Sequence, residues 1–412
     1  ARIPLPGVLG RVCPAPCEGT CRRGTVDQPV AIRLLKRWVA DADRRAPAWR
    51  PEVARQTGRR VAVVGAGPAG LSAAYYLRLL GHEATLIDER AQPGGRLLEI
   101  APWELPPDVL ADDVERVLAL GVEFQPETQL GRDVTLAQLQ RHFDAVLIAI
   151  GEADEATAEA VGLPWGHRGF EADRHTHAGP LEAVFVAGSS LSPSHMAVRA
   201  VASGRAAALS VDQFVRRKEI APEGRPFNVT MGRLLREEAL RLAADASVHG
   251  RIEPSRGEGA GFNDEEAVRE GLRCMHCDCR ALPTCRLRAL GEQYHADTHA
   301  WHGQRRLFRR DGTHPAIIFE PGKCIACGLC IEVAKRYAEE LGLTFIGRGF
   351  DVRTAVPFGA PLAEGLRRAA LECAEVCPTG ALVQADDAEE EAGGDEERWR
   401  ADADGGSPDE AV

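Results

Sequence analysis

Residues 60–70 read RVAVVGAGPAG, in which an apolar run leads into the pattern Gly65-x-Gly67-x-x-Gly70. In such a pattern the first glycine permits a tight turn, the second lets the backbone approach a pyrophosphate, and the third allows close helix packing. The N-terminus of the following helix adds positive charge for phosphates. Asp88 ends the next apolar run, EATLID, where an acid is expected to bind ribose hydroxyls. The stretch therefore predicts a dinucleotide-binding fold; a glycine-rich turn in another kind of α/β protein is the alternative.

Strand and helix patterns alternate from this stretch onwards. Helical runs through Leu80, over 107–120 and through Val215 alternate with apolar strands at 83–88, 122–125, 145–151 and 183–189. Such alternation is typical of a doubly wound sheet. We therefore expect an α/β fold with a Rossmann-like domain over residues 59–216.

Twelve cysteines lie outside this domain in three groups. The groups are Cys13, Cys17 and Cys21; Cys274, Cys277, Cys279 and Cys285; and Cys324, Cys327, Cys330, Cys373 and Cys377. Grouped cysteines in a large chain that opens without a secretory signal indicate metal or redox use instead of structural disulfides. They also indicate a reducing compartment, which we expect to be the cytoplasm.

The third group contains a ferredoxin-type run. Cys324-x2-Cys327-x2-Cys330, with a distant Cys377-Pro378, is typical of [4Fe–4S] ligation, and a zinc site is the alternative. In a two-cluster ferredoxin the fourth cysteine of each run serves the other cluster. Here Ala334, Arg367 and Ala370 occupy three of the positions of the second cluster's ligands. We therefore expect one cluster, with Cys373 left without a role in it.

The N-terminal half resembles the flavoprotein family of the glutamate synthase small subunit and the N-terminal part of dihydropyrimidine dehydrogenase. The resemblance covers about residues 5–215 and rests on GRVCPAPCEGTCRRG at 10–24, LPPDVL at 105–110, LGVEF at 120–124 and DERAQPGGRL at 88–97. It implies FAD as the nucleotide. The residues that it implies for FAD binding are Gly65, Gly67, Pro68, Ala69, Gly70, Asp88, Glu89, Gly94, Gly95, Arg96, Leu97, Ala149, Gly151, Gly188, Ser189 and Ala197.

Two departures from the family pattern matter. Family members carry a second glycine-rich insert that binds NADPH between the last two strands, but the residues between Gly151 and Val184 hold no such pattern and are too few for a nucleotide domain. We therefore expect no NAD(P)H-binding domain. Ser189 stands where the family has a carboxylate that would contact the flavin's ribityl chain. A hydroxyl can still form hydrogen bonds, so we expect FAD to be retained.

The C-terminal part resembles the ferredoxin-like region of the large iron–sulfur subunit of complex I and of related formate dehydrogenases, through KCIACGLC, FIGRGFDVRTAVPFGAPL and CPTGAL. In the glutamate synthase family a CxxC run and the CPxxCExxC head together hold two [4Fe–4S] clusters. The run at 274–285 is a plausible substitute for the missing CxxC run. One ligand must then be a residue other than cysteine, and Gln28 and His276 are both candidates. If the 274–285 run binds zinc by itself, two clusters remain instead of three.

Composition suggests six parts along the chain. They are an iron–sulfur head at 1–58 with a helix near 30–40, the flavin domain at 59–216, a linker at 217–262 with a helix near 231–244, a cysteine-rich segment at 263–316, a ferredoxin-like domain at 317–384 and a disordered acidic tail at 385–412. The chain opens without Met, so we expect a segment upstream. His295, His299, His302 and His314 lie near several arginines, and a basic, partner-facing surface is favoured over a metal site.

The formal net charge of −11 argues against nucleic acid as a main partner. No apolar run is long enough to span a membrane. These features together predict an electron-transfer subunit with FAD and three [4Fe–4S] clusters, which connects a partner's catalytic subunit to another carrier and is inactive alone. The candidate partners are catalytic subunits of formate dehydrogenase or hydrogenase type. The alternatives are an NAD(P)H-dependent oxidoreductase of the glutamate synthase type and a scaffold that has lost its flavin.

Overall fold

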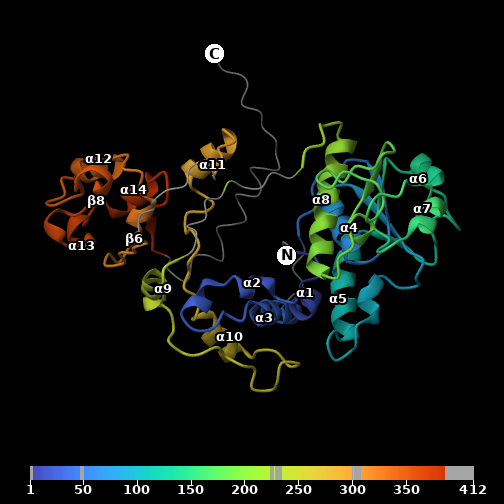
Figure 1. The fold of residues 1–412 in the computed structure, drawn as a ribbon, viewed down its shortest axis with the longest axis horizontal. Helices are drawn as coiled ribbons and strands as arrows, with labels where there is room; N and C mark the ends of the chain where they lie inside the picture. Colours follow the sequence, from blue (N-terminus) through green and yellow to red (C-terminus); the bar gives the residue numbers. More distant parts are fainter. Residues whose placement is uncertain are drawn as a thin grey trace, which may run out of the picture. The chain divides into compact units, whose positions relative to one another are not determined.

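A computed structural model describes residues 3–46, 51–222, 227, 234–298, 300 and 308–385 (Figure 1). These residues divide into two compact units, and each is described by itself. The first comprises Ala1–Cys21, Pro29–Gly224 and Arg251–Leu272, and the second Arg22–Gln28, Arg225–Gly250 and Arg273–Val412. The expected acidic tail, from residue 386 to its end, lies outside the described residues. Within the described part, no helix is both long and apolar enough to cross a membrane.

A parallel sheet of five strands forms the core of the first unit. Its strands are β1 (Arg60–Val64), β2 (Glu83–Ile87), β3 (Glu123–Gln125), β4 (Ala145–Ile148) and β5 (Val184–Val186). Their order across the sheet is β3-β2-β1-β4-β5, and every neighbouring pair is parallel. The chain therefore passes from β1 outwards to β3 and returns to β4 on the other side, which is the doubly wound topology predicted from the sequence.

Helices of the first unit cover both faces of this sheet. The helices of the unit are α1 (Pro6–Val12), α2 (Pro16–Gly19), α3 (Ile32–Arg45), α4 (Pro68–Leu79), α5 (Pro107–Leu118), α6 (Leu136–His142), α7 (Glu155–Val161), α8 (Ala197–Val215) and α10 (Asp264–Gly271). Of these, α4, α5 and α8 lie on one face of the sheet, and α6 and α7 on the other. Because side chains alternate along a strand, Val61 and Val63 pack with α4, α5 and α8, whereas Ala62 and Val64 pack with α6 and α7. All four strand residues are buried. The expected α/β class with a Rossmann-like domain is confirmed.

The short helix α1 is held on two sides through glycines. A Cβ atom at Gly7 would lie 2.9 Å from Cγ1 of Val109 in α5, and one at Gly10 would lie 2.7 Å from Cα of Arg37 in α3. Both distances are too short for a real side chain, so these positions allow the backbones to approach closely. The cysteine-rich head is thereby packed directly against the flavin domain's helix α5.

Helix α3 is longer than the sequence analysis predicted. The sequence predicted a helix near 30–40, whereas α3 continues through Arg45. Asp41 accepts a hydrogen bond from Arg11 of α1 at 2.8 Å, and Arg44 donates to Asp112 of α5 at 2.7 Å. The polar composition of this stretch therefore reflects ion pairs between helices instead of an unfolded connection.

The second unit contains a small α/β domain at its C-terminal end. Its elements are β6 (Ile317–Phe319), α12 (Leu329–Arg336), β7 (Thr344–Ile346), β8 (Arg353–Ala355), α13 (Leu362–Gly365), α14 (Ala370–Glu375) and β9 (Leu382–Gln384). Strand β6 pairs antiparallel with β9, and β7 pairs antiparallel with β8. Both pairs border a core that includes Leu362, Leu366 and Cys373. Outside this domain the unit holds α9 (Arg236–Leu242) and α11 (Arg286–Gln293).

The stretch 217–262, expected to be a linker, is partly packed. The helix expected near 231–244 corresponds to α9, whose Leu242 is buried with Met275 and Phe308. At the other end of the stretch, Ile252 and Phe262 pack with Leu34 of α3. The stretch therefore contributes residues to the cores of both units.

One buried acid joins α1 to α5. Asp113 is 1% exposed, its Oδ2 accepts a hydrogen bond from the amide of Val8 at 2.8 Å, and its Oδ1 is buried without a hydrogen-bond partner in the described part of the chain. Burial raises the pKa of Asp113 to about 6, and the bond from Val8 offsets only part of this effect. Ionised Asp113 is therefore costly in the folded protein.

Replacing Asp113 should make folding stability less dependent on pH. Because the pKa is raised on folding, the wild type binds more protons folded than unfolded, so its stability falls as pH rises from about 4 to about 7, by about 3 kcal/mol at most. Asp113→Asn, which keeps an oxygen for the Val8 amide, should remove that fall and be the more stable protein at about pH 8. Urea denaturation of both proteins across this range, with cofactors bound, measures the difference. If the difference in unfolding free energy between the two proteins did not change with pH, Asp113 would not have the raised pKa.

Candidate flavin and iron–sulfur sites

The glycine loop between β1 and α4 has the backbone geometry that a bound pyrophosphate needs. Gly65 has a φ of +105°, and a Cβ atom there would lie 2.2 Å from the carbonyl oxygen of Ala149. A Cβ atom at Gly70 would lie 1.8 Å from the carbonyl oxygen of Gly65. At Gly67, by contrast, a Cβ atom would meet only Gly95, at 4.0 Å. Gly65 and Gly70 are thus required by the protein's own packing. Gly67 instead borders open space on the side where a ligand's phosphates are expected.

Asp88 binds the glycine loop itself. Its Oδ2 accepts a hydrogen bond from the amide of Ala66 at 2.6 Å, and its Oδ1 accepts one from the amide of Arg90 at 2.8 Å. The residue is 8% exposed, whereas the neighbouring Glu89 is exposed. A carboxylate has further lone pairs for ribose hydroxyls, so the expected ribose contact stays a prediction. The role in organising the loop was not foreseen from the sequence.

The second glycine pair packs against the first loop. The amide of Gly94 donates to the carbonyl of Ala66 at 2.9 Å, and a Cβ atom at Gly95 would lie 2.8 Å from Cα of Gly67. The 3-10 turn that follows (Gly95–Glu99) buries Leu97 and leaves Arg96 exposed in an ion pair with Glu152, 3.2 Å away. Residues expected at the flavin from two separate parts of the sequence therefore lie in contact.

The loops after β4 and β5 complete the same edge of the sheet. A Cβ atom at Gly188 would lie 2.7 Å from Cβ of Ala69, and the carbonyl of Gly151 accepts a hydrogen bond from Ser190 at 2.9 Å. Ser189 Oγ donates to the carbonyl of Ser194 at 3.2 Å. The remaining expected residues are Pro68, which opens α4, and Ala197, which opens α8. Because the strands are parallel, all these loops follow carboxyl ends, where ligands of such sheets bind.

The segment between β4 and β5 has no room for a second nucleotide domain. All of residues 149–183 are described, and they form one helix, α7, together with an isolated bridge between Trp165 and Phe170. A nucleotide-binding unit would need at least another βαβ motif. The connection is therefore a short loop-and-helix link across the sheet.

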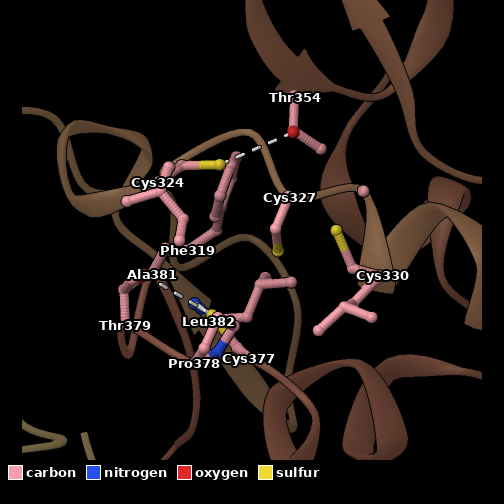
Figure 2. A pocket seen from close by; sticks show the side chains of 13 residues that line it. Phe319, Cys324, Cys327, Cys330, Thr354, Cys377, Pro378, Thr379, Ala381 and Leu382 are labelled. Carbon is pink, nitrogen blue, oxygen red and sulfur yellow. Dashed lines mark hydrogen bonds between the residues drawn. The ribbon is translucent and has the colours of Figure 1, made fainter. Parts of the chain in front are cut away.

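Four cysteines of the C-terminal domain line a single pocket (Figure 2). Cys324, Cys327 and Cys330 come from the loop before α12 and from its first turn, and Cys377 comes from the turn after α14. The pocket has about 350 Å³ of space free of protein atoms, and its other walls are apolar side chains such as Phe319 and Leu382. Four thiols around an apolar hollow are the donor set of a [4Fe–4S] cluster, so these residues fit the expected group.

Burial and hydrogen bonds distinguish the four thiols. Burial, together with the nearby thiols of Cys324, Cys377 and Cys327, raises the pKa of the Cys330 thiol to about 12. The sulfur of Cys324 accepts from the amide of Ala326 at 3.3 Å, and that of Cys377 accepts from the amide of Leu382 at 3.4 Å. Amide donors of this kind stabilise negative charge on cluster sulfurs.

Apolar packing fills the position of a second ferredoxin cluster. Ala334, Ala370 and Cys373 are all buried in the domain's hydrophobic core, and Arg367 instead pairs with Glu340 at 3.5 Å. The Cys373 thiol is fully buried and donates to the carbonyl of Cys330 at 3.4 Å. Burial raises its pKa to about 12. That Cys373 is not a cluster ligand stays a prediction.

Arginines bind the backbone of the Cys274–Cys277 loop. The carbonyls of Arg273, His276 and Cys277 accept hydrogen bonds from Arg23, Arg310 and Arg22, at distances of 3.0–3.1 Å. His276 has a φ of +43° directly before Cys277, as Ala326 has a φ of +56° directly before Cys327. The two CxxC loops thus share an unusual left-handed residue. These arginines are not part of any recognisable sequence motif, so the sequence analysis did not identify them.

The end of the same cysteine run contacts the ferredoxin-type site. Cys285 lies at the N-terminus of α11, and its sulfur is 3.7 Å from the carbonyl oxygen of Pro378, which also accepts from the amide of Leu287 at 3.1 Å. A Cβ atom at Gly380 would lie 2.2 Å from Cβ of Ala281. The run is therefore packed tightly on the turn that carries Cys377.

The remaining cysteines that were expected to bind clusters belong to two different units. Cys13 is buried, Cys17 is exposed and Cys21 is half-buried, and all three belong to the first unit, whereas Cys274, Cys277, Cys279 and Cys285 belong to the second. The shared ligand set, with Gln28 or His276 as an additional ligand, stays a prediction. Within the described residues, no group of three or more His, Cys, Asp or Glu could hold a single metal ion.

Of the histidines expected on a basic surface, His314 is buried instead. Its Nδ1 accepts from the amide of Ala316 at 3.0 Å and its Nε2 donates to the carbonyl of Leu366 at 2.8 Å. His314 thus joins two loops of the ferredoxin-like domain. His295 is exposed, and His299 and His302 lie outside the described residues.

Two family models match the N-terminal half of the chain. Pyridine nucleotide-disulphide oxidoreductase matches residues 31–204, and the 4Fe-4S cluster domain II of dihydropyrimidine dehydrogenase matches residues 1–47. The chain thus has a flavin-type oxidoreductase domain and a 4Fe–4S domain.

Several curated proteins are similar to this half. The chain is 44% identical to the NADP(+)-dependent formate dehydrogenase subunit beta of Moorella thermoacetica, over 41% of this chain and 27% of that protein. It is 38% identical to the NADPH-Fe(3+) oxidoreductase subunit beta of Geobacter sulfurreducens, over 41% and 26%. It is 34% identical to the glutamate synthase [NADPH] small chain of Bacillus subtilis, over 36% and 30%.

The chain therefore spans less than a third of the length of these relatives. The matches to the two domain models and to these subunits agree with the resemblance found in the head and glycine motifs. The expected resemblance is thus confirmed: the chain matches these two domain models over residues 1–204 and is similar to a glutamate synthase small chain and to an NAD-dependent dihydropyrimidine dehydrogenase subunit.

Proposed function

We propose that the chain is an electron-transfer subunit of a multi-subunit oxidoreductase and relays electrons between FAD, [4Fe–4S] clusters and a partner's catalytic subunit. The observation that carries this proposal is the presence in one chain of a flavin-type glycine loop and of a four-thiol pocket. FAD exchanges electrons in pairs or singly and each cluster exchanges one, so such a chain suits a relay.

The residues proposed for FAD are those of the loops at the carboxyl edge of the parallel sheet. Gly67 leaves the space for the pyrophosphate, Gly65 and Gly70 form the turn, and Asp88 holds the loop in position. Ser189 can offer a hydroxyl where the family has a carboxylate. What this chain does is bind and orient the flavin, and the electron chemistry belongs to the cofactor.

We further propose three clusters. Cys324, Cys327, Cys330 and Cys377 hold one, and the thiols of Cys13, Cys17 and Cys21 combine with those of the 274–285 run for the other two. The similarity of the CxxC loops at His276 and Ala326 supports cluster binding at the 274–285 run over a zinc site. Zinc at that run would leave two clusters.

The names of the relatives support a partner subunit of formate dehydrogenase or similar type. The Moorella and Geobacter proteins are named as beta subunits, so each works with other subunits. That the partner of this chain carries the substrate site is a proposal by analogy. It fits a chain in which the link between β4 and β5 is too short for a hydride-donor domain.

An NAD(P)H-dependent enzyme of the glutamate synthase type is the second candidate, because the relatives' names include NADP(+) and NADPH. It requires a nicotinamide site outside the described flavin edge. A scaffold without flavin is the third candidate, and absorbance near 450 nm with FAD released on denaturation would exclude it.

Gly67→Val should strip the flavin and leave the fold intact. The backbone at Gly67 is extended, and a Cβ atom there would meet only Gly95, at 4.0 Å. The valine should therefore clash with the bound pyrophosphate and not with the protein. FAD released per chain should fall by about tenfold or more, while iron content stays the same. Gly271→Val, where the structure also has open space, serves as the control and should keep its flavin. Full flavin content in Gly67→Val would contradict the proposal that the FAD pyrophosphate binds at this glycine.

The isolated chain should not oxidise NADH or NADPH at a useful rate. Anaerobic stopped-flow absorbance would follow flavin reduction after mixing with either nucleotide, and a chemical reductant would show that the same flavin can be reduced. Fast, saturable reduction by a nucleotide would instead favour the enzyme of the glutamate synthase type. Slow reduction that becomes fast when the partner subunit is added would support the relay.

Iron analysis tests the ligand set. With three clusters the protein should contain about twelve iron atoms. Cys377→Ser should lose about a third of this iron, because Cys377 lines the four-thiol pocket. Cys373→Ala is the matched control: it should lower stability through a cavity in the core but keep the iron, because Cys373 packs in the hydrophobic cluster. If Cys373→Ala lost iron and Cys377→Ser kept it, the fourth ligand of this cluster would have been assigned to the wrong cysteine.

A further inference from the structure

A buried hydroxyl lies beside one thiol of the four-cysteine pocket. Thr354 is on β8, in the segment that forms an antiparallel hairpin with β7, and it is 2% exposed. Its Oγ1 is 3.6 Å from Sγ of Cys324, and Figure 2 shows the hydroxyl pointing at that sulfur. The hairpin therefore adds a polar group to a pocket whose other walls are mostly apolar.

The sulfur is the partner of this hydroxyl. Among the described residues, Thr354 has no hydrogen-bond partner for its side chain other than Cys324. A buried hydroxyl without a partner is costly. As a free thiol, Cys324 can be donor or acceptor. As a thiolate bound to iron it has no hydrogen, so the Thr354 hydroxyl must donate.

We infer that Thr354 is a positioning residue that raises the reduction potential of the cluster held by Cys324, Cys327, Cys330 and Cys377. This inference rests on the proposed function, since it assumes a cluster in that pocket. Reduction adds one electron and no proton to the cluster, and the electron comes from the flavin or from another cluster. A hydrogen bond to a ligand sulfur stabilises the more negative, reduced form more strongly, and therefore raises the potential.

The surroundings make this bond effective. Thr354 is buried, and a hydrogen bond from a buried hydroxyl to a charged sulfur is stronger than it would be at the surface. Two backbone amides, those of Ala326 and Leu382, also donate to the cluster sulfurs, but substitution cannot remove them. Thr379 Oγ1 lies 3.9 Å from Sγ of Cys377, a longer and weaker contact. Thr354 is thus the side-chain donor with the shorter distance.

Thr354→Val should lower the midpoint potential of this cluster. Valine has nearly the same shape as threonine and removes only the hydroxyl, so the pocket should stay closed. Potentiometric titration followed by electron paramagnetic resonance on the full chain measures the midpoint, and the relevant signal is the one that Cys377→Ser lacks. Thr354→Ser, which keeps a hydroxyl, should restore most of the wild-type value. Thr344→Val, on the same hairpin but outside the pocket, should leave the midpoint unchanged.

The outcomes separate this inference from the function on which it rests. A cluster signal whose midpoint is the same in Thr354→Val and wild type would overturn the role of Thr354 and leave the relay intact. The absence from the wild type of any signal that depends on Cys377 would overturn both. If Thr354→Val fails to assemble the cluster, Thr354→Ala takes its place, and an unchanged or raised midpoint in that variant would count equally against the inference.

Discussion

The hydrogen bond between Asp88 and the amide of Ala66 is the contact on which the flavin edge depends. It fixes the glycine loop to the end of β2, and the carbonyl of the same Ala66 accepts from Gly94. One residue of the loop therefore connects three segments that are separate in sequence. Gly95 also packs on this loop, because a Cβ atom there would lie 2.8 Å from Cα of Gly67. The glycine loop and the second glycine pair are therefore held against one another.

In the second unit, four thiols line a pocket whose other walls are mostly apolar. A deprotonated thiol is unfavourable there, as the raised pKa of Cys330 indicates. A bound cluster would compensate for this cost, because it takes thiolates as ligands and neutralises much of their charge. The domain core next to the pocket is filled by Ala334, Ala370 and Cys373, which pack as ordinary buried residues. The cysteine run at 274–285, which packs on Pro378 through Cys285, occupies the neighbouring surface instead.

The sequence predicted the parts that follow from local patterns. Gly65, Gly67, Gly70 and the alternation of strands with helices were sufficient for the doubly wound sheet, because each glycine has its own steric reason. The spacing of Cys324, Cys327 and Cys330 was sufficient for a pocket formed by neighbouring residues. What could not be predicted depends on charge pairs between distant elements: helix α3 runs past Ala40 because its aspartates pair with arginines of other helices. A polar stretch with such partners has the same composition as a linker.

The arginines around Cys274–Cys277 illustrate the same limit at the site. Arg22, Arg23 and Arg310 come from two segments nearly three hundred residues apart, and each donates to a backbone carbonyl instead of to a side chain. Backbone acceptors leave no pattern in a sequence, so only the fold can reveal them. Positive groups close to a cysteine loop favour thiolates, and they would also stabilise the negative charge of a reduced cluster bound there. The three hydrogen bonds therefore hold the backbone of residues 273–277 in place, whichever residues complete the ligand set.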